Sequence, residues 1–445
     1  MRSHGAVMST QSALEVQSMG PVQGLARRIL DGEVVVLRRA LQQSGLYDAF
    51  VQATLKGIRS VIGDEKTYAV ERDGFDRIHE RVTPAEIPAV TDAVYEVMTA
   101  MAHTALQALT SRLFADAGVF YFERSPNVRF HIPYDLAANQ RTEYRQFAQR
   151  HGDGKITAHG PHRDPWVDCP DNAINIWMAL GPVRRGNGLT IFKDEYRKQF
   201  AFRDGYIDSS VSLHRPLNFE LEAGDAVLFH SNHLHGSELN RTDRTRYVVS
   251  YRITFGKPHY PHGHYHHYLH AGLAAGRLRW LAGIPQNLQW SFLRYQFHRL
   301  RYKIVGRGKM SGSDASMVQT ASKPLALPEN GSILLADFPI GTIRAISEDV
   351  CVARFGVEHF AAVSRRCSHM GGDLAGGWVD EGKIVCPLHS LSFDPRSGKS
   401  PCSSLRPLKR YTCDVRTDRV YTGLEIKRSS LEDKVLSGAS KHRDA

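Results

Sequence analysis

The chain has 445 residues, of which 42% are hydrophobic, and this length exceeds one ordinary core, so we expect two or three domains. Its six cysteines exclude a disulfide scaffold and are typical of metal binding in a reducing compartment, the cytoplasm. The formal net charge of +11 favours a solvated basic face, then an acidic redox partner or substrate. Nucleic acid is not expected as a partner, because the sequence has no zinc-finger spacing or RNA-recognition motif.

The N-terminal part predicts a tail and then mixed structure. Residues 1–20 are polar and small and predict a loose tail without a signal peptide. The stretch GEVVVLRRAL predicts a strand over 34–37 and then an amphipathic helix, and 86–114 carries apolar residues at helical spacing. From residue 118, short apolar or alternating runs are separated by Pro, Gly and Asp, which is typical of an antiparallel barrel or jelly roll.

The C-terminal part is more varied in composition. Residues 257–270 hold six histidines and predict a surface loop or cap, with a second metal site as the alternative. Residues 276–305 interleave aromatic and basic residues. They predict a helix that docks on the barrel, an interfacial basic helix, or a docking surface for the next domain. Residues 306–324 are a Gly/Ser-rich linker, 325–425 form a compact second β pattern, and 426–445 are a charged tail. No window approaches ~20 apolar residues, so no membrane span is expected.

The first set of candidate site residues lies in the β region. His162 and Asp164, separated by one residue, can bind one metal ion from the same side of the chain. His235 is the best third ligand. Two His and one carboxylate on one face of a metal leave positions open for O₂ and a bidentate co-substrate, which suits Fe(II). Arg246, on a following strand-like run, can hold a dicarboxylate bidentately, and Ser237 can add a hydrogen bond.

This pattern, with Asn240 and the run Phe229-His230-x4-His235-Gly236-Ser237, resembles the phytanoyl-CoA dioxygenase family of Fe(II)/2-oxoglutarate oxygenases. The resemblance covers roughly residues 30–260 and assigns 1–305 to an oxygenase domain. It implies a mostly β, α+β fold, in which a double-stranded β-helix (jelly-roll, cupin-like) barrel carries supporting helices.

The resemblance also implies roles for single residues. His162, Asp164 and His235 would bind Fe(II), and Arg246 and Ser237 would hold the distal carboxylate of 2-oxoglutarate. Asp164 stands where the related halogenases have a small residue, which favours hydroxylation or desaturation with O₂. The substrate is expected to be a small organic molecule whose identity the sequence does not name.

Several neighbours compete with these assignments. For three more histidines we expect a structural role, or contact with a metal-binding side chain rather than with the metal itself: His159, His230 and His233. Arg246 has three rivals: Arg241, Arg244 and Arg252. Strand parity puts Arg252 on the same face as Arg246. The choice of Arg246 therefore rests on the distance along the chain at which the family places its arginine after the last histidine. Four residues either line the pocket or belong to the core: Arg129, Trp166, Asn175 and Trp177.

The second set of candidate site residues lies in the later β pattern. Cys367-Ser-His369 is followed, after sixteen intervening residues, by Cys386-Pro-Leu-His389. A Rieske [2Fe–2S] cluster needs two thiolates on one iron and two imidazoles on the other, with one of each in each loop. A Cys₂His₂ zinc site is the alternative, but zinc fingers place the two Cys together and then the two His. The segment 325–425 resembles the Rieske ferredoxin family, which implies a small all-β domain.

This chain departs from respiratory-type Rieske proteins in two features that affect the redox potential of the cluster. Respiratory-type Rieske proteins carry an extra Cys in each loop, where this chain has Gly372 and Leu388. A Tyr that hydrogen-bonds the cluster in those proteins is replaced by Phe393. Fewer hydrogen bonds predict a potential toward the negative end of the roughly −150 to +300 mV Rieske range. The remaining cysteines are expected to be buried thiols: Cys169, Cys351, Cys402 and Cys413.

The combination predicts a 2-oxoglutarate-dependent dioxygenase whose fused cluster supplies or recycles electrons to the mononuclear iron. In one hypothesis the cluster re-reduces iron left as Fe(III) after uncoupled turnover. In a second, the protein is a Rieske-type oxygenase that draws electrons from NAD(P)H through a reductase without 2-oxoglutarate. A third makes it a non-enzymatic electron-transfer protein. A reductase or a ferredoxin is the expected redox partner.

Overall fold

The computed structural model describes residues 13–16, 24–114, 118–139, 159–167, 169–203, 206–207, 211–261, 268–274, 281–282, 328, 331–369, 371–387, 390–403 and 405–425. The chain divides into two compact units. The first comprises Met1–Asp208, His214–Ser322 and Leu388–Ser390, and the second comprises Ser209–Leu213, Lys323–Pro387 and Leu391–Ala445. The expected linker 306–324, the tail 426–445 and nearly all of the expected helix 276–305 lie outside the described residues, as does the middle of the His-rich stretch.

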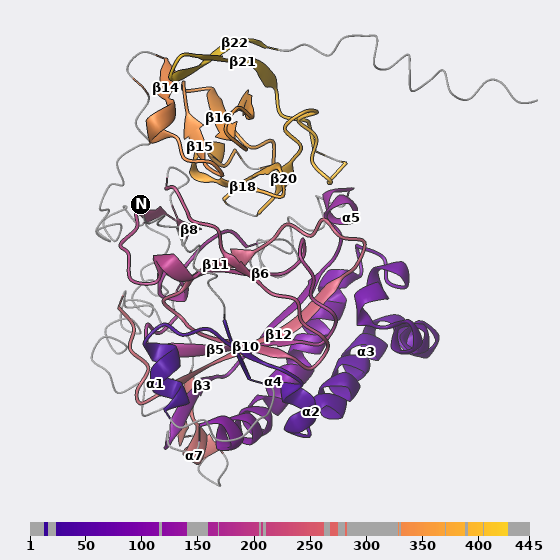
Figure 1. Cartoon of the computed structure of the whole chain (residues 1–445). Coiled ribbons are helices and arrows are strands. Elements are labelled where there is room, and N and C mark those ends of the chain that lie inside the picture. Colours follow the sequence, from indigo (N-terminus) through magenta and orange to yellow (C-terminus); the bar gives the residue numbers. More distant parts are fainter. Residues whose placement is uncertain are drawn as a thin grey trace, which may run out of the picture. The chain divides into compact units, whose positions relative to one another are not determined.

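The first unit contains the helices α1 (Leu25–Leu30), α2 (Ala40–Gln43), α3 (Tyr47–Asp73), η1 (Phe75–Glu80) and α4 (Ile87–Leu113), with the short α5 (Tyr134–Asn139) and α7 (Ala271–Ala274) later in the chain. The two long helices, α3 and α4, lie together on one side of the first unit with α2 beside them, and further short helices lie elsewhere around it (Figure 1). The predicted helix over 86–114 is confirmed by α4. A proline in its first turn favours the start of the helix, and its apolar face buries Val90, Val94 and Met98.

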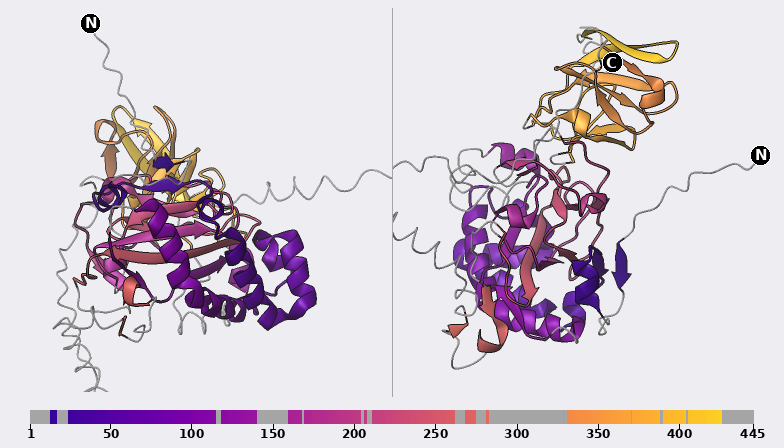
Figure 2. Two further views of the ribbon diagram at one scale, coloured as in Figure 1. Left: turned by 90° about the horizontal axis from the view of Figure 1, so that it is seen from below. Right: turned by 90° about the vertical axis from the view of Figure 1, so that its left-hand side faces the viewer.

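A large sheet lies beside these helices. Its strand order is β1-β2-β10-β5-β12-β3-β13, and β4 also pairs with β12. The bounds are β1 (Leu14–Val16), β2 (Val35–Leu37), β3 (Phe120–Glu123), β4 (Asn127–His131), β5 (Ala173–Ala179), β10 (Ala226–His230), β12 (Arg246–Phe255) and β13 (Tyr268–His270). One face of this sheet forms the main hydrophobic core with α3 and α4 (Figure 2).

A smaller sheet has the order β11-β6-β9, with β6 (Leu189–Phe192), β9 (Leu217–Asn218) and β11 (Leu234–Ser237). A second core joins it to the large sheet, because Leu189 and Ile191 pack with Trp177 and Phe229. The short hairpin β7 (Phe202–Arg203) and β8 (Tyr206–Ile207) and the turns η3 (Asp164–Val167) and η4 (Lys193–Glu195) complete the unit. Two facing sheets with helices on the outside are the predicted double-stranded β-helix, and this prediction is confirmed.

Strand alternation decides which side chains face the second sheet. On β12, Tyr247, Val249 and Tyr251 belong to the helix-side core. The alternate residues therefore point the other way, and Arg246 and Arg252 are among them. The large sheet thus directs two buried guanidinium groups into the space between the sheets.

The second unit is all β, as predicted. A six-stranded sheet has the order β14-β22-β21-β17-β16-β15, and a three-stranded sheet has the order β18-β19-β20. The bounds are β14 (Ser332–Leu334), β15 (Ile343–Ala345), β16 (Val350–Arg354), β17 (Phe360–Ser364), β18 (Trp378–Asp380), β19 (Lys383–Val385), β20 (Ser392–Phe393), β21 (Arg410–Arg416) and β22 (Arg419–Glu425), with turns η6 (Leu335–Asp337) and η7 (Leu374–Gly376). Phe338, Val352 and Val420 are central to its core.

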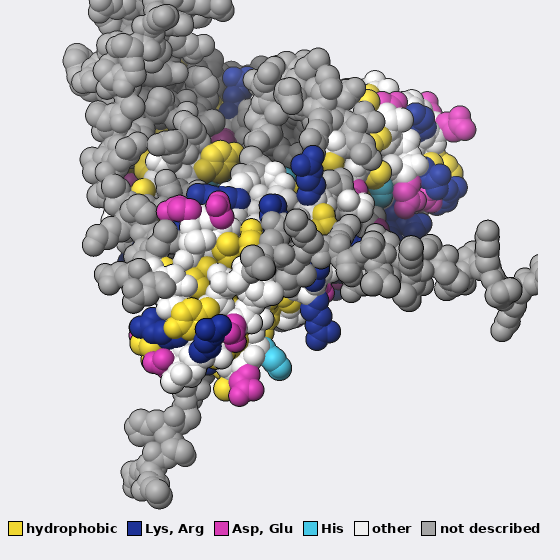
Figure 3. All heavy atoms as spheres, turned by 90° about the horizontal axis from the view of Figure 1, so that it is seen from above, with side chains coloured by type: hydrophobic (Ala, Val, Ile, Leu, Met, Phe, Trp, Pro, Cys, Tyr) yellow, Lys and Arg dark blue, Asp and Glu magenta, His cyan; other side chains and the backbone are white. Residues whose placement is uncertain are grey.

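The exposed surface mixes both signs of charge. On the face drawn in Figure 3, the basic and acidic side chains of the described residues lie among one another. Exposed pairs such as Arg28–Glu33 and Arg416–Asp414 illustrate this. Within the part of the chain that the structure describes, no helix is long and apolar enough to cross a membrane.

Candidate functional site

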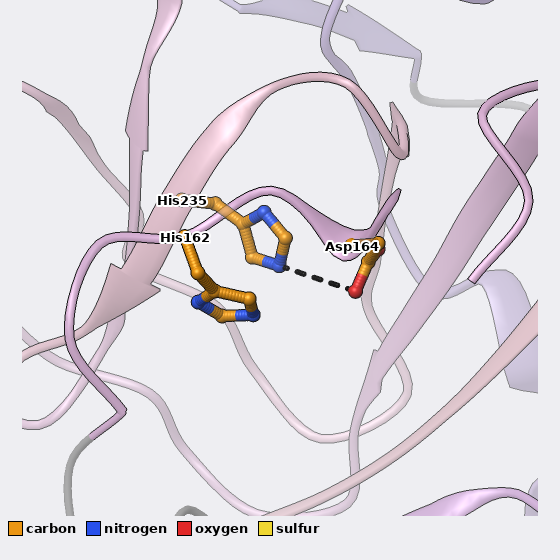
Figure 4. A group of neighbouring side chains, drawn as sticks. All are labelled: His162, Asp164 and His235. Carbon is orange, nitrogen blue, oxygen red and sulfur yellow. Dashed lines mark ion pairs between the residues drawn. The ribbon is translucent and has the colours of Figure 1, made fainter. Parts of the chain in front are cut away.

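Three buried side chains converge in the first unit: His162, Asp164 and His235 (Figure 4). One potential ligand atom of each lies within 4.8 Å of those of the other two. Nε2 of His235 lies 4.0 Å from Oδ1 of Asp164. The structure therefore brings together the three residues that the sequence suggested as metal ligands.

The backbone holds the two histidines opposite each other. The amide of His162 donates to the carbonyl of His235, and the amide of His235 donates to the carbonyl of His162, both at 2.9 Å. At the next residue, Gly236, a Cβ would lie 2.9 Å from the carbonyl oxygen of His159. Glycine therefore permits the close approach of the two ligand-bearing segments.

Hydrogen bonds fix the tautomer of both rings. Nδ1 of His162 lies 2.9 Å from the carbonyl of Gly160, and Nδ1 of His235 lies 2.9 Å from that of His233. A carbonyl only accepts, so each Nδ1 carries the proton and each Nε2 keeps a lone pair. Burial lowers the pKa of His162 to about 3 and also lowers the pKa of His235, so both rings are neutral, the form that binds a metal.

Asp164 is held through both of its oxygens. Nη2 of Arg252 donates to Oδ1 at 2.6 Å, and Nδ2 of Asn175 donates to Oδ2 at 2.6 Å. Burial favours the neutral acid, but attraction to Arg252 and the hydrogen bond from it outweigh burial and hold the pKa of Asp164 well below its ordinary value. The carboxylate is therefore ionised and oriented before any metal binds.

Arg252 has a second acidic partner that the sequence did not identify. Its Nη1 donates to Oε2 of Glu123 at 3.0 Å, and both side chains are buried. Burial alone would lower the pKa of Arg252, but Asp164, Cys169 and Glu123 together raise it well above its ordinary value. Arg252, a rival to Arg246 by strand parity, thus contacts a candidate metal ligand.

Arg246 lies in a different environment. Its Nη1 donates to the carbonyls of Asn187 (2.8 Å) and Gly188 (3.0 Å), its Nη2 lies 3.3 Å from the hydroxyl of Ser237, and its guanidinium carbon is 5.7 Å from the ring centre of Trp177. Its buried Nε has no hydrogen-bond partner among the described residues. Burial lowers the pKa of Arg246 to about 9. This buried cation keeps an unused donor at Nε, and no carboxylate among the described residues accepts a hydrogen bond from it, an environment that fits an anionic ligand.

The competing residues have other contacts. The ring of His159 stacks on that of His162 with 4.0 Å between centroids. His230 hydrogen-bonds the hydroxyl of Tyr196, and Nε2 of His233 lies 3.1 Å from the carbonyl of Gly32. Arg244 pairs with Asp76 at 3.3 Å, Arg241 lies 3.8 Å from Glu238, and Trp166 stacks on Phe202. Among the described residues, the group that could hold a metal ion contains His162, Asp164 and His235 alone.

The second unit carries the candidate cluster ligands in two loops. In the first, the amide of Cys367 donates to the carbonyl of Gly372, and the amide of Gly371 donates to the carbonyl of Cys367, both at 2.9 Å. In the second, the amide of Cys386 donates to the carbonyl of Leu391 at 2.9 Å. Cys367 and Cys386 are buried and His369 is half-buried. His389 and Leu388 lie outside the described residues.

A buried ion pair closes the base of the first loop. Arg365 donates from Nε to both oxygens of Asp373 at 3.0 Å and from Nη2 to Oδ2 at 2.6 Å. Asp373 also accepts from the amide of Ala375 at 3.0 Å and so caps η7. The pair joins the two ends of the loop that contains Cys367 and His369.

The other cysteines agree only partly with expectation. Cys169, Cys351 and Cys402 are buried, as predicted. Cys413 is half-buried, because β21 pairs with β22 in a hairpin whose outer residues are largely exposed.

Comparison with known families agrees with both halves of this arrangement. Residues 70–248 match the model of the phytanoyl-CoA dioxygenase family, and residues 334–412 match the model of the Rieske [2Fe–2S] domain. The chain joins a phytanoyl-CoA dioxygenase domain to a Rieske domain. It is therefore an oxidoreductase of the dioxygenase class with an iron–sulfur domain for electron transfer.

Similar proteins cover the two domains separately. The Rieske domain is 34% identical over 88 residues to the 3-phenylpropionate/cinnamic acid dioxygenase ferredoxin subunit of Photorhabdus laumondii, a match that covers 19% of this chain and 84% of that one. The ferredoxin of carbazole 1,9a-dioxygenase from Nocardioides aromaticivorans is 28% identical, covering 20% and 91% of the two chains with a TM-score of 0.18. The carbocyclase SnoK from nogalamycin biosynthesis is 12% identical, covering 60% and 94% with a TM-score of 0.32.

We predict that His162→Ala in the dioxygenase domain weakens Fe(II) binding by roughly 100-fold or more, because it removes one of three ligands. Anaerobic titration with Fe(II) and a colorimetric iron assay would measure this. His230→Gln is the matched control: this neighbouring histidine lies outside the group of three and should leave iron stoichiometry unchanged. Equal loss in both variants would contradict the assignment.

We predict that Asp373→Ala in the Rieske domain lowers the free energy of unfolding by about 3–5 kcal/mol, because it removes the only carboxylate that is hydrogen-bonded to the buried Arg365 among the described residues. Loss of the visible absorption of the cluster on mild heating would report the opened loop. Glu348→Ala is the control, since Glu348 is exposed and lies 3.8 Å from the same arginine. Its effect should stay below about 1 kcal/mol. An Asp373→Ala protein that is stable and holds a full complement of cluster would refute this role of the Arg365–Asp373 pair.

Proposed function

We propose that this protein is an Fe(II)/2-oxoglutarate-dependent dioxygenase that hydroxylates, or desaturates, a small organic substrate. The observation that carries the proposal is the pairing of two sites in one domain. A buried group of two neutral imidazoles and one carboxylate lies in the same domain as a buried arginine–serine pair with unused donors. Two His and one carboxylate leave open positions on a ferrous ion.

The chain's residues fit such an ion. His162 and His235 would bind it through Nε2, because their Nδ1 protons are engaged by carbonyl groups. Asp164 would supply the single negative ligand. Bound iron with 2-oxoglutarate would supply O₂ activation coupled to oxidative decarboxylation, a chemistry that side chains alone lack.

Arg246 and Ser237 would hold the distal carboxylate of 2-oxoglutarate. The guanidinium is oriented by the carbonyls of Asn187 and Gly188 and stacks on Trp177, so it is ordered in advance. A carboxylate would also neutralise a cation that burial otherwise disfavours. The buried surroundings exclude water from the pair and strengthen that attraction.

The fused Rieske domain needs its own explanation. A 2-oxoglutarate oxygenase takes two electrons from the keto acid and requires no external donor. We propose that the cluster returns one electron to iron that uncoupled turnover has left as Fe(III). The curated relatives of this domain are ferredoxin subunits of dioxygenases, and they support an NAD(P)H-dependent reductase or a ferredoxin as the electron source.

We predict that Arg246→Gln weakens 2-oxoglutarate binding by about 30- to 150-fold, because a charge-assisted contact contributes roughly 2–3 kcal/mol. Ser237→Ala should cost about tenfold or less. Anaerobic titration of the Fe(II) protein, followed by the metal-to-ligand absorption band of bound keto acid, would give both affinities. Arg244→Gln, a neighbour paired with Asp76, is the control. Succinate release with a substrate panel would complete the test, and the absence of any absorption band in the native protein would refute the proposal.

We predict that Cys367→Ser leaves the first turnovers at the native rate but shortens the active life of the enzyme several-fold, because oxidised iron is no longer re-reduced. Single-turnover and progress-curve measurements of succinate would separate the two effects. Loss of the first turnover would instead favour electrons from a reductase as drivers of the chemistry. Activity with NAD(P)H and a reductase but without 2-oxoglutarate would establish that alternative, and no turnover at all would leave an electron-transfer protein.

A further inference from the structure

The large sheet surrounds Asp164 with a set of contacts that iron binding does not require. Arg252 on β12 and Asn175 on β5 are direct neighbours across the two strands, and each donates to a different oxygen of Asp164 at 2.6 Å. Glu123 on β3, the strand beside β12, accepts from the other end of the same guanidinium at 3.0 Å. These side chains are all buried.

The oxygen that faces the metal position is the one bonded to the cation. Oδ1 of Asp164 lies 4.0 Å from Nε2 of His235 and accepts from Arg252, while Oδ2 is taken by Asn175. A carboxylate held in this way presents one oxygen to an ion. A guanidinium hydrogen-bonded to that oxygen withdraws electron density from it and makes it a weaker donor to the metal.

The charges of this group can be counted directly. Asp164 and Glu123 contribute two negative charges, Arg252 one positive charge, and the two neutral histidines none, so the group carries a net charge of −1. Removing the charge of Arg252 would make it −2, and removing that of Glu123 would make it 0. Because the group is buried, such a change acts on a nearby ion with little screening.

We infer that Arg252 and Glu123 are positioning residues that set the preference of the mononuclear iron for Fe(II) over Fe(III). Arg252 orients the carboxylate ligand and its positive charge disfavours the trivalent ion more than the divalent one, while Glu123 moderates that charge. The inference rests on the proposed iron site. It deepens the proposed recycling, in which Fe(III) gains one electron, the reduced cluster loses one, and a reductase that oxidises NAD(P)H reduces the cluster again.

Because Arg252 and Glu123 carry opposite charges, their removal should shift the Fe(III)/Fe(II) equilibrium in opposite directions, and this difference in sign is the test. Removing the positive charge with Arg252→Gln should favour Fe(III), and removing the negative charge with Glu123→Gln should favour Fe(II). We expect each change to shift the equilibrium by about tenfold, or about 59 mV for a one-electron couple, in opposite directions. Arg252→Lys keeps the positive charge but loses the two-pronged guanidinium that contacts both acids. It should shift the equilibrium less than Arg252→Gln. A merely structural role would not produce shifts of opposite sign.

The experiment is a redox titration of the full-length, iron-loaded protein without 2-oxoglutarate, in which electron paramagnetic resonance follows mononuclear Fe(III). The Rieske cluster in the same sample serves as an internal reference, because its potential should not change among the variants. Opposite shifts support the inference, and shifts in the same direction, or none, overturn it. Should Arg252→Gln fail to fold or to retain iron, Glu123→Gln decides alone: a raised potential supports the inference, and an unchanged or lowered one overturns it.

Failure of the proposed function would be seen separately. If the native protein binds iron but shows no keto-acid absorption band, the 2-oxoglutarate assignment fails while the redox shifts remain measurable. If the native protein binds no iron at the three ligands, both the proposed function and this inference fail.

Discussion

The buried carboxylate of Asp164 is the charge on which the rest of the first domain's site depends. An ionised group away from water is costly unless it is paired, and two neighbouring strands of the large sheet supply the pairing through Arg252 and Asn175. His235 belongs instead to the small sheet and is joined to His162 by reciprocal backbone hydrogen bonds. The candidate metal-binding group therefore exists only where the two sheets face each other.

Much of this could be predicted from residue types and spacing. The His-x-Asp pair, the later His235 and the alternation of the strands predicted the group of three and the two-sheet fold. The roles of Arg246 and Arg252 could not be separated in the same way, because both face the same side of β12. Their contacts across the sheets differ: Arg252 lies opposite Asn175, whereas Arg246 contacts Ser237 on β11 and loop carbonyls. Strand register is a tertiary property that one sequence does not encode locally.

Glu123 and Asp373 were missed for a related reason. Each is an acidic residue in an ordinary-looking run, and its importance comes from a buried arginine that it contacts, Arg252 or Arg365. A buried arginine without a partner is far more costly than an exposed one, so the acid is as necessary as the cation. The cluster motif was predictable because ligand chemistry fixes the residue types, whereas the ion pair that closes its first loop has no comparable motif.

The two halves of the chain also constrain each other's chemistry in the proposed function. The keto acid supplies both electrons for a coupled turnover, so the cluster acts only after an uncoupled turnover has left Fe(III). Electron return then requires that the mononuclear iron be the better acceptor. A cluster with few hydrogen bonds to its sulfurs favours a low donor potential, and a guanidinium bonded to the iron's carboxylate favours a high acceptor potential. Phe393 in one domain and Arg252 in the other would thus increase the same driving force, although they belong to separately folded units.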